Sequence, residues 1–325
     1  MVVAFIQRAV VQGIPLLFGS TGEILTEKSG NLNLGTAGVM YVGGICGVIG
    51  GFFYEQNAAN MNSFLAVLIP LLCSVVGSAI MGIIYALLTV TLKANQNVTG
   101  LALTTFGVGF GNFFGGSLIK LSGLDVPSIT LSKTSLCFKT KIPFAEKLGV
   151  IGDIFFSYSF LAYVAVIIAV IVSIYFTKTR SGLKLRAVGE NPATADAAGV
   201  NVERYKYVSI IIGSVIAGLG GLYYVMDYAC GVWSNDGFGD RGWLAIALVI
   251  FAIWRPNISI FGSILFGGLF IIHNYIPGLS MGAQELFKMA PYAVTIIVLV
   301  IISMLQKREF QPPASLGLSY FREER

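Results

Sequence analysis

Long runs of apolar residues, separated by short polar segments, dominate the chain. A helix of about 20 apolar residues crosses the hydrocarbon core of a bilayer. The runs lack the strict alternation of apolar and polar positions that marks barrel strands, so they predict helices. The nine runs are Val3–Leu25, Gly35–Phe53, Phe64–Leu92, Val98–Ile119, Ile154–Phe176, Tyr207–Tyr228, Trp243–Trp254, Ile258–Ile276 and Leu286–Leu305.

Two of these runs are irregular. Val3–Leu25 contains Gly13, Pro15 and Glu23, so we expect a kinked or partly interfacial helix there. Trp243–Trp254 is short for a full crossing, which predicts a broken or re-entrant segment. The pattern as a whole predicts an all-α integral membrane protein. We expect a polytopic bundle of roughly 8–10 transmembrane helices with broken or re-entrant segments.

Composition supports this fold class. Of the 325 residues, 55% are hydrophobic and 11% are charged, and the mean hydropathy is +0.80. An ordinary soluble domain carries about 25% charged residues, so a soluble protein, a disordered chain and a basic nucleic-acid binder are all excluded. The net charge of +5 therefore concerns orientation in the membrane rather than binding to nucleic acid.

Lysine and arginine in the short polar flanks predict which ends face the cytoplasm. Segment 178–206 carries six of these residues and segment 307–325 carries four, so both are expected inside. Counting crossings then places loop 120–153 outside, although it carries five lysines, and places Arg255 and residues 27–33 inside.

The expected organisation is one transmembrane domain, residues 1–310, followed by a cytoplasmic tail, residues 311–325. The side on which the N-terminus lies depends on whether Val3–Leu25 truly spans, and the sequence leaves this open.

Residues that support catalysis or metal binding are sparse. Cys46, Cys73, Cys137 and Cys230 have spacings that match neither a metal site nor a small disulfide framework. His273 is the single histidine, which argues against a His-based metal site or a Ser-His-Asp triad. No G-x-x-x-x-G-K-S/T phosphate loop is present, so the chain is not expected to be an ATPase or another enzyme. No predicted span has a charged residue at its centre, which argues against an ion-coupled carrier.

The largest predicted cytoplasmic loop contains a short helix. Asn191 is a favourable N-cap, Pro192 suits the first helical position, and Gly199 suits a left-handed C-cap. Between them lie small residues, including Ala195 and Ala198. Such a helix can seat in a groove of another protein, because no bulky side chain holds it away. An ordinary helical loop on the membrane surface is an equally good interpretation.

One predicted span carries a polar stripe. Asn97, Thr104, Thr105 and Asn112 recur near a spacing of seven and fall roughly on one helical face, and Phe106 adds an aromatic ring nearby. These five residues are the candidate wall of a solute path, because polar groups and aromatic faces are what a polar solute with a flat ring needs. Hydrogen bonding between helices is the alternative explanation.

Glycines in the same span allow a second interpretation. Gly107, Gly109 and Gly111 precede Asn112 and are the best candidates for a broken helix that lines a path. Tight helix packing is the plainer explanation for most glycines inside the spans.

Three motifs in order resemble a known family. Gly189–Pro192, followed by Ala197–Val200, resembles the cytoplasmic coupling segment of ABC-transporter permeases of the ribose, branched-chain amino acid and nucleoside class. Glu27–Gly35 looks like that family's early charged-Ser-Gly-x-x-Asn-x-Gly signature. Asp240–Ala247, continuing to residues 254–256, looks like the shorter of the two paired permeases of nucleoside importers.

The resemblance extends from about Pro15 to Leu305, with two departures. Ala37 stands where many members have an acidic residue, and Ala252 where they often have glycine. Because the family carries purine nucleosides, riboflavin and sugars, these departures leave the exact solute open.

The resemblance implies a permease subunit of an ABC importer in the cytoplasmic membrane of a bacterial-type cell. It implies a second homologous permease, an extracytoplasmic solute-binding protein, and an ATPase subunit that binds ATP and magnesium in place of this chain. A purine nucleoside is the expected solute. Riboflavin or a simple sugar is the alternative, and an ion-coupled secondary transporter is a more distant one. The residues expected to dock into the ATPase are Glu190, Asn191, Pro192, Ala195, Ala198 and Gly199.

Overall fold

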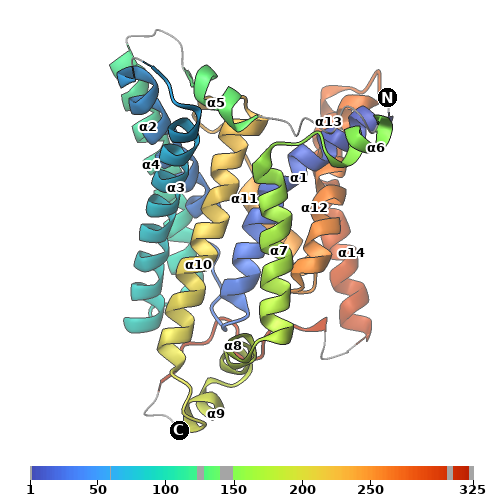
Figure 1. Ribbon diagram of the computed structural model, residues 1–325. Coiled ribbons are helices and arrows are strands. Elements are labelled where there is room, and N and C mark those ends of the chain that lie inside the picture. Colours follow the sequence, from blue (N-terminus) through green and yellow to red (C-terminus); the bar gives the residue numbers. More distant parts are fainter. Residues whose placement is uncertain (1, 59, 123–127, 140–148, 306–309, 322–325) are drawn as a thin grey trace.

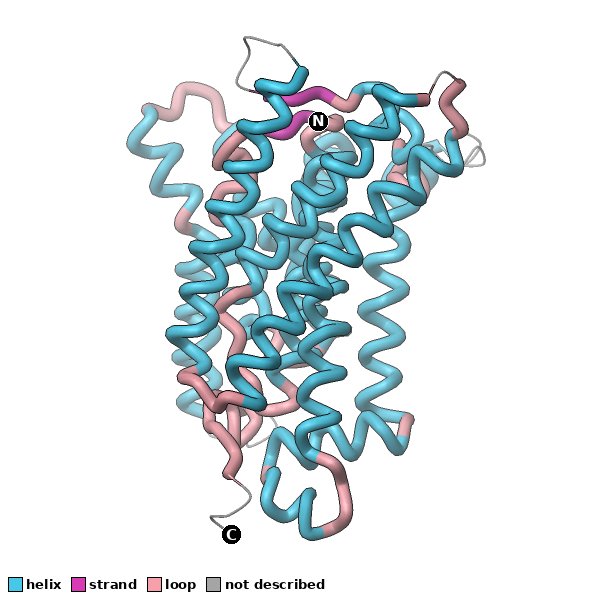
Figure 2. Tube along the Cα trace, turned by 90° about the vertical axis from the view of Figure 1, so that its left-hand side faces the viewer, coloured by secondary structure: helices cyan, strands magenta, loops and turns pink. Residues whose placement is uncertain are grey.

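The computed structural model describes residues 2–58, 60–122, 128–139, 149–305 and 310–321. Much of the expected external loop 120–153 and residues 322–325 of the expected tail lie outside the described residues. Helices run side by side through the molecule (Figure 1), and the same arrangement is visible after a quarter turn (Figure 2). The fold is all-α, as predicted, with one small pair of strands.

Eight helices in the described part of the chain are long and apolar enough to cross a membrane. This number agrees with the predicted range. Two of the spans end in a π-helical turn, η1 (Leu87–Thr91) after α3 and η3 (Tyr224–Tyr228) after α10, and η4 (Ile272–Tyr275) is a 3-10 turn after α12. The spanning helices are α1 (Val2–Glu27), α2 (Thr36–Asn57), α3 (Ser63–Ala86), α4 (Gln96–Ser122), α7 (Phe160–Lys178), α10 (Val202–Tyr223), α12 (Pro256–Ile271), and α13 (Met281–Lys288) together with α14 (Ala290–Leu305).

Short elements lie at the two ends of the bundle. At the end that holds the N-terminus are α5 (Ser132–Phe138), α6 (Gly149–Phe155) and the strands β1 (Ser128–Thr130) and β2 (Val232–Ser234). The strands pair antiparallel, with Ile129 opposite Trp233. At the other end are α8 (Arg180–Glu190) and α9 (Pro192–Ala197). The basic segment 178–206 marks this second end as cytoplasmic, so the N-terminus lies outside.

The helix α11 (Arg241–Phe251) is too short to span. Its 11 residues rise about 16 Å, against a hydrocarbon core of about 30 Å. It follows a connection that starts at the outer strand β2, and it ends where Trp254 donates a hydrogen bond from Nε1 to the carboxylate of Glu27. A broken or re-entrant segment was predicted here from length alone. The structure has the broken form, because the chain enters at the outer strand β2 and leaves beside Glu27 at the cytoplasmic end of α1.

Glycines bring the central helices into close contact. A Cβ built on Gly22 would overlap the carbonyl oxygen of Gly213, and one built on Gly43 would overlap the backbone of Gly218. These contacts join α1 and α2 to α10, and α2 and α10 are the most buried of the spans. Small residues are what allow such approach in lipid, where little hydrophobic force acts between helices.

The connection between α1 and α2 does not lie flat on the cytoplasmic face, as a simple loop would. Thr36, the first residue of α2, donates a hydrogen bond to Glu23, which is one turn above the end of α1. Residues 28–35 therefore turn back into the bundle as a short non-helical connection. They run alongside α4, where a Cβ on Gly100 would meet the nitrogen of Leu34 at 2.7 Å.

Candidate functional site

The cytoplasmic segment α8–α9 has the local structure that the sequence predicts. Asn191 caps α9 by accepting a hydrogen bond at Oδ1 from the backbone nitrogen of Thr194, at 3.0 Å. Pro192 occupies the first turn, where its missing N–H is harmless. Gly199 ends the motif with φ of +79°, in the left-handed region that favours glycine.

The side chains of this segment divide between two sides. Ala195 is only 5% exposed and packs against Val188 and Val202 in a small apolar cluster of its own. Glu190, Asn191, Ala198 and Gly199 are exposed, and Pro192 is half-buried. The expectation that Ala195 contacts a partner directly is therefore wrong in this structure. Its methyl group instead holds α9 on the body of the protein, so that Ala198 and Gly199 face outward.

A second support for α9 comes from residues 310–321, which we call the C-terminal strap. Tyr320 donates a hydrogen bond from its hydroxyl to Oδ2 of Asp196 at 2.8 Å. Ser315 donates from its backbone nitrogen to the carbonyl oxygen of Gly189 at 3.0 Å, and Gly317 donates to the carbonyl of Gly30 at 3.2 Å. The strap thus joins α8, α9 and the α1–α2 connection, a set of pairings that no sequence motif indicated.

The strap also reaches the start of α4. The side chain of Gln96 donates from Nε2 to the carbonyl of Leu318 at 3.4 Å and accepts at Oε1 from the nitrogen of Leu32 at 2.7 Å. Lys93 lies over the ring of Phe321, 4.3 Å from its centroid. The coupling segment, the strap and the beginning of α4 therefore form one connected cytoplasmic layer.

The signature Glu27–Gly35 forms a buried polar network above this layer. Asn33 accepts a hydrogen bond at Oδ1 from the nitrogen of Gly35 at 2.9 Å, and its own nitrogen donates to Glu23 at 3.1 Å. Tyr85 donates to the carbonyl of Leu32 at 2.6 Å. Glu23 is buried. These contacts satisfy the backbone of a non-helical segment that lies inside the bundle.

Lys28 stands where this network meets α8. A Cβ built on Gly189 would overlap the carbonyl oxygen of Lys28, so α8 approaches the segment closely. Burial lowers the pKa of Lys28 to about 8, and the positive charge of nearby Arg186 contributes to the shift. The glycine at 189 in the coupling motif is therefore needed for contact with the α1–α2 connection.

The residues of the predicted polar stripe on α4 have different partners. Thr104 donates a hydrogen bond at 2.8 Å to the carbonyl of Leu34, which belongs to the α1–α2 connection and not to a second helix. Thr105 is exposed and donates to Leu101 in its own helix at 3.2 Å. Asn97 is exposed near the cytoplasmic end of α4. Asn112 donates from Nδ2 to Oδ1 of Asp236 at 3.0 Å.

The glycines of α4 serve packing rather than a break. The helix is continuous from Gln96 to Ser122, so the expected interruption at Gly107–Gly111 is wrong. A Cβ on Gly107 would overlap the backbone of Gly38, and one on Gly111 would meet the ring of Tyr41 at 2.5 Å. Gly107 and Gly111 therefore allow α2 to pack closely against α4, while Gly109 faces open space.

The outward face of α4 carries aromatic rings. Phe106 is 54% exposed, and the ring series continues through Phe110 and Phe114, with centroids 6.0 and 4.5 Å apart along the series. Asn112 is half-buried and its partner Asp236 is exposed. At 3.6 residues per turn, Asn112 lies about 160° around α4 from Phe110 and Phe114, on the other flank of the helix. The accessible surface of α4 therefore carries aromatic rings on one flank and an amide and a carboxylate on the other.

Two residues of this region escaped the sequence analysis as candidates. Asp236 lies in the connection between β2 and α11, and Arg241 begins α11. The guanidinium of Arg241 is buried over the rings of Tyr224 and Tyr228, at 4.6 and 4.9 Å from their centroids, and donates to the carbonyl of Phe238 at 2.8 Å. The Asp240–Arg241–Gly242 motif was the available signal, and the structure shows that its arginine anchors the connection between β2 and α11.

Comparisons with known proteins agree with this architecture. Residues 5–299 match the family model described as branched-chain amino acid transport system / permease component. A nucleoside ABC transporter permease of Lactococcus lactis subsp. cremoris is 28% identical over 98% of this chain and 97% of its own length. A putative glucose ABC transporter permease of Haloferax volcanii is 30% identical, with coverage of 98% and 97%. A guanosine ABC transporter permease of Bacillus subtilis is 29% identical over 90% of each chain.

These relatives are permease subunits, and the family implies an ATPase and a substrate-binding protein as partners. With eight apolar spanning helices among its described residues, the chain is a multi-pass protein of the cell membrane. It belongs to the branched-chain amino acid transport system permease family and is a permease subunit of an ABC importer.

Proposed function

We propose that this chain forms, with a second and similar permease, the membrane path for a nucleoside. The named relatives support the solute class, since two of them are a nucleoside permease and a guanosine permease. A second nucleoside ABC transporter permease of Lactococcus lactis is 24% identical over 88% of this chain. Similarity to two permeases of one organism supports a heteromeric pair. The pair would dock on ATPase subunits that bind ATP and magnesium and would receive solute from an extracytoplasmic binding protein.

The observation that carries the proposal is the outward face of α4. A purine ring is flat and apolar on its faces, and the rings of Phe106 and Phe110 offer matching surfaces. Ribose hydroxyls donate and accept hydrogen bonds, and the Asn112–Asp236 pair supplies an amide and a carboxylate on the other flank of the same helix. Because this face is left open in the single chain, a second permease opposite it would complete an enclosed path.

The connected cytoplasmic layer offers a route by which movement of the ATPase subunits would reach the solute path. Closure of the ATPase subunits would move the exposed part of α9, and the strap would carry that movement through Tyr320 and Ser315 to the α1–α2 connection. The connection runs alongside α4, so the proposed path lies next to the element that moves. A ligand or nucleotide can shift this equilibrium only by binding one state more tightly than the other.

A sugar is the second candidate solute, because a relative of equal coverage is a putative glucose permease. A simple sugar lacks a flat aromatic ring, so it gains little from the phenylalanine series. Substitutions on this face therefore distinguish the two solutes as well as test the path.

The test is uptake in proteoliposomes that contain the chain with its second permease, ATPase and solute-binding protein. Labelled guanosine should accumulate only with ATP, and unlabelled guanosine should compete while glucose and riboflavin should not. Asn112→Ala should lower the uptake rate about tenfold, as expected for loss of a solute hydrogen bond worth about 1.4 kcal/mol. Ser117→Ala is the matched control on the same helix, because Ser117 bonds only within α4 among the described contacts.

Other outcomes would replace the proposal. Competition by glucose without competition by guanosine would make the chain part of a sugar importer. Uptake driven by an ion gradient in the absence of ATP would point to a secondary transporter. Equal rates for the Asn112→Ala and Ser117→Ala transporters would remove the α4 face from the path.

A further inference from the structure

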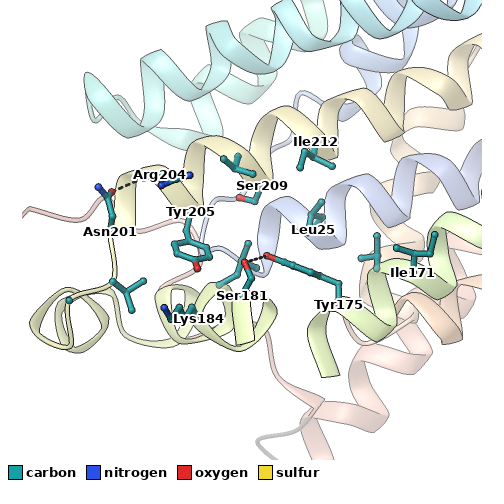
Figure 3. Close-up of a pocket in the computed structure, with 15 residues that line it drawn as sticks. Leu25, Ile171, Tyr175, Ser181, Lys184, Asn201, Arg204, Tyr205, Ser209 and Ile212 are labelled. Carbon is teal, nitrogen blue, oxygen red and sulfur yellow. Dashed lines mark hydrogen bonds between the residues drawn. The ribbon is translucent and has the colours of Figure 1, made fainter. Parts of the chain in front are cut away.

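A groove of about 710 Å³ lies at the cytoplasmic end of the bundle, between α7, α8 and α10 (Figure 3). It is separate from the α4 face, and it shares only Gly199 with the residues predicted to dock on the ATPase. Its volume falls in the range of ligand pockets, which is about 300–1,000 Å³. The two halves of its lining differ in character, and this difference indicates what it binds.

The half toward the membrane interior is apolar and open to the side. Ile171 on α7 is 58% exposed, and Val208 and Ile212 on α10 are each 47% exposed. Leu25 of α1 is buried and closes the back of the groove. All four side chains belong to spanning helices, so this wall stands against lipid chains rather than water.

The half toward the cytoplasm is basic and polar. Lys184 of α8 and Arg204 in the first turn of α10 line it, and both side chains are exposed. Ser181 and Tyr175 face the same space and bond to each other through their hydroxyls at 3.1 Å. No aspartate or glutamate is among the described residues that line the groove. The cations therefore have no lining acid to neutralise them.

The ends of the spanning helices show at what depth in the membrane the basic half of the groove lies. Span α7 ends at Lys178 and span α10 begins at Val202, so Lys184 and Arg204 lie at the boundary where phospholipid headgroups sit. Basic pockets between helices on the cytoplasmic side attract acidic headgroups, while the acyl chains remain in the hydrocarbon region. A soluble anion would contact only the basic half of the groove, which faces the cytoplasm, and would leave the apolar half empty.

We propose that this groove binds one anionic phospholipid of the cytoplasmic leaflet. Its phosphate would lie between Lys184 and Arg204, and its acyl chains would follow Ile171 and Ile212 out to the bilayer. Gly199, Val200 and Asn201 line the same groove. The bound headgroup would thus touch the connection between α9 and α10, directly behind the segment proposed to dock on the ATPase.

The experiment uses native mass spectrometry of the purified full-length chain in mild detergent. The protein is mixed with equal amounts of dioleoyl phosphatidylglycerol and dioleoyl phosphatidylcholine, and the retained lipids are counted. The wild-type chain should prefer phosphatidylglycerol, and K184Q/R204Q should lower that preference about 30-fold, as expected for the loss of two basic contacts. K178Q/R180Q removes the same charge from the neighbouring stretch, outside the groove, and should retain the preference.

A second pair of variants tests the apolar wall. Ile212→Trp fills the groove and should reduce retention of phosphatidylglycerol at least fivefold. Ile174→Trp places the same ring on an exposed position of α7 that does not line the groove, and should have no effect. Loss in both members of either pair would show general surface attraction and overturn the proposal.

Two further measurements test whether a soluble anion or the partner ATPase occupies the groove instead of a lipid. Inorganic phosphate and glycerol 3-phosphate, each in excess, should fail to displace phosphatidylglycerol. Displacement by either would assign the basic half of the groove to a soluble anion instead. The measurement is repeated on the transporter assembled with its ATPase, where the lipid should remain bound. Release on assembly would mean that the partner protein covers the groove, which also contradicts the proposal.

Discussion

The division of side chains on α9 leads to a sharp test of the coupling role. Ala195 is 5% exposed inside the cluster of Val188 and Val202, whereas Ala198 is exposed at the tip of the same segment. Leucine at position 195 has no room, and overpacking a filled core costs about 1–3 kcal/mol. At about 2 kcal/mol the fraction of molecules with α9 detached from the body rises about 30-fold. Leucine at position 198 changes stability by less than about 0.5 kcal/mol, as is usual for exposed sites.

Two measurements on the reconstituted transporter distinguish these effects. Hydrogen exchange in residues 188–202 should become faster in Ala195→Leu and stay as in the wild type in Ala198→Leu. The ratio of solute transported to ATP hydrolysed should fall at least tenfold in Ala198→Leu, because the added side chain lifts the segment from its partner. Ala187→Leu is the control, an exposed position on α8 outside the predicted docking residues. Normal coupling in Ala198→Leu, with normal exchange, would refute the docking surface.

Three further predictions follow from other contacts. Tyr320→Phe removes the bond to Asp196 and should raise protease cleavage of the strap severalfold, measured by mass spectrometry, whereas Tyr54→Phe on the outer side should not. Gly221→Ala should lower the free energy of unfolding in detergent by more than about 1 kcal/mol, because the added Cβ would overlap the carbonyl of Met40. Gly116→Ala is the control and should leave it unchanged, because nothing lies within 4 Å of that position. The lowered pKa of Lys28, about 8, means that the unfolded chain binds more protons between about pH 8 and 10.4, so stability should rise with pH across that window. Lys28→Met should remove the part of the rise due to this group, and an unchanged unfolding profile would contradict the burial argument.

Hydrophobic pattern was sufficient for most of the transmembrane architecture. The predicted run Gly35–Phe53, which the structure shows as α2 from Thr36 to Asn57, needed only its apolar length. The same measure identified α11 as too short to cross. These predictions succeed because the bilayer imposes one requirement on every span, that its backbone bonds be satisfied within the segment.

Features that depend on contacts between distant segments could not be predicted in this way. Residues 28–35 are polar and follow a span, so they read as a surface loop, yet Tyr85 and Gln96 provide the bonds that let them enter the bundle. Thr104 and Thr105 are neighbours of the same residue type, but only Thr104 lies close enough to Leu34 to donate a hydrogen bond to its carbonyl. In α9, a helix of six residues, the pattern is too short to show which alanine faces the body.

The docking proposals remain predictions for a related reason. Caps at Asn191 and Gly199 are local and were correctly predicted, because they depend on residues within a few positions of each other. What the segment touches outside this chain is set by partner surfaces, which neither spacing nor burial within one subunit can define.

The C-terminal strap has a consequence for biogenesis. Residues 310–321 leave the ribosome after every helix described above, and Tyr320 reaches Asp196 only when α14 has returned the chain to the cytoplasmic side. A nascent permease whose last span is not yet inserted therefore has an α9 without the bond from Tyr320. Under the proposed docking, an ATPase subunit would meet a firmly held α9 only after membrane insertion has finished.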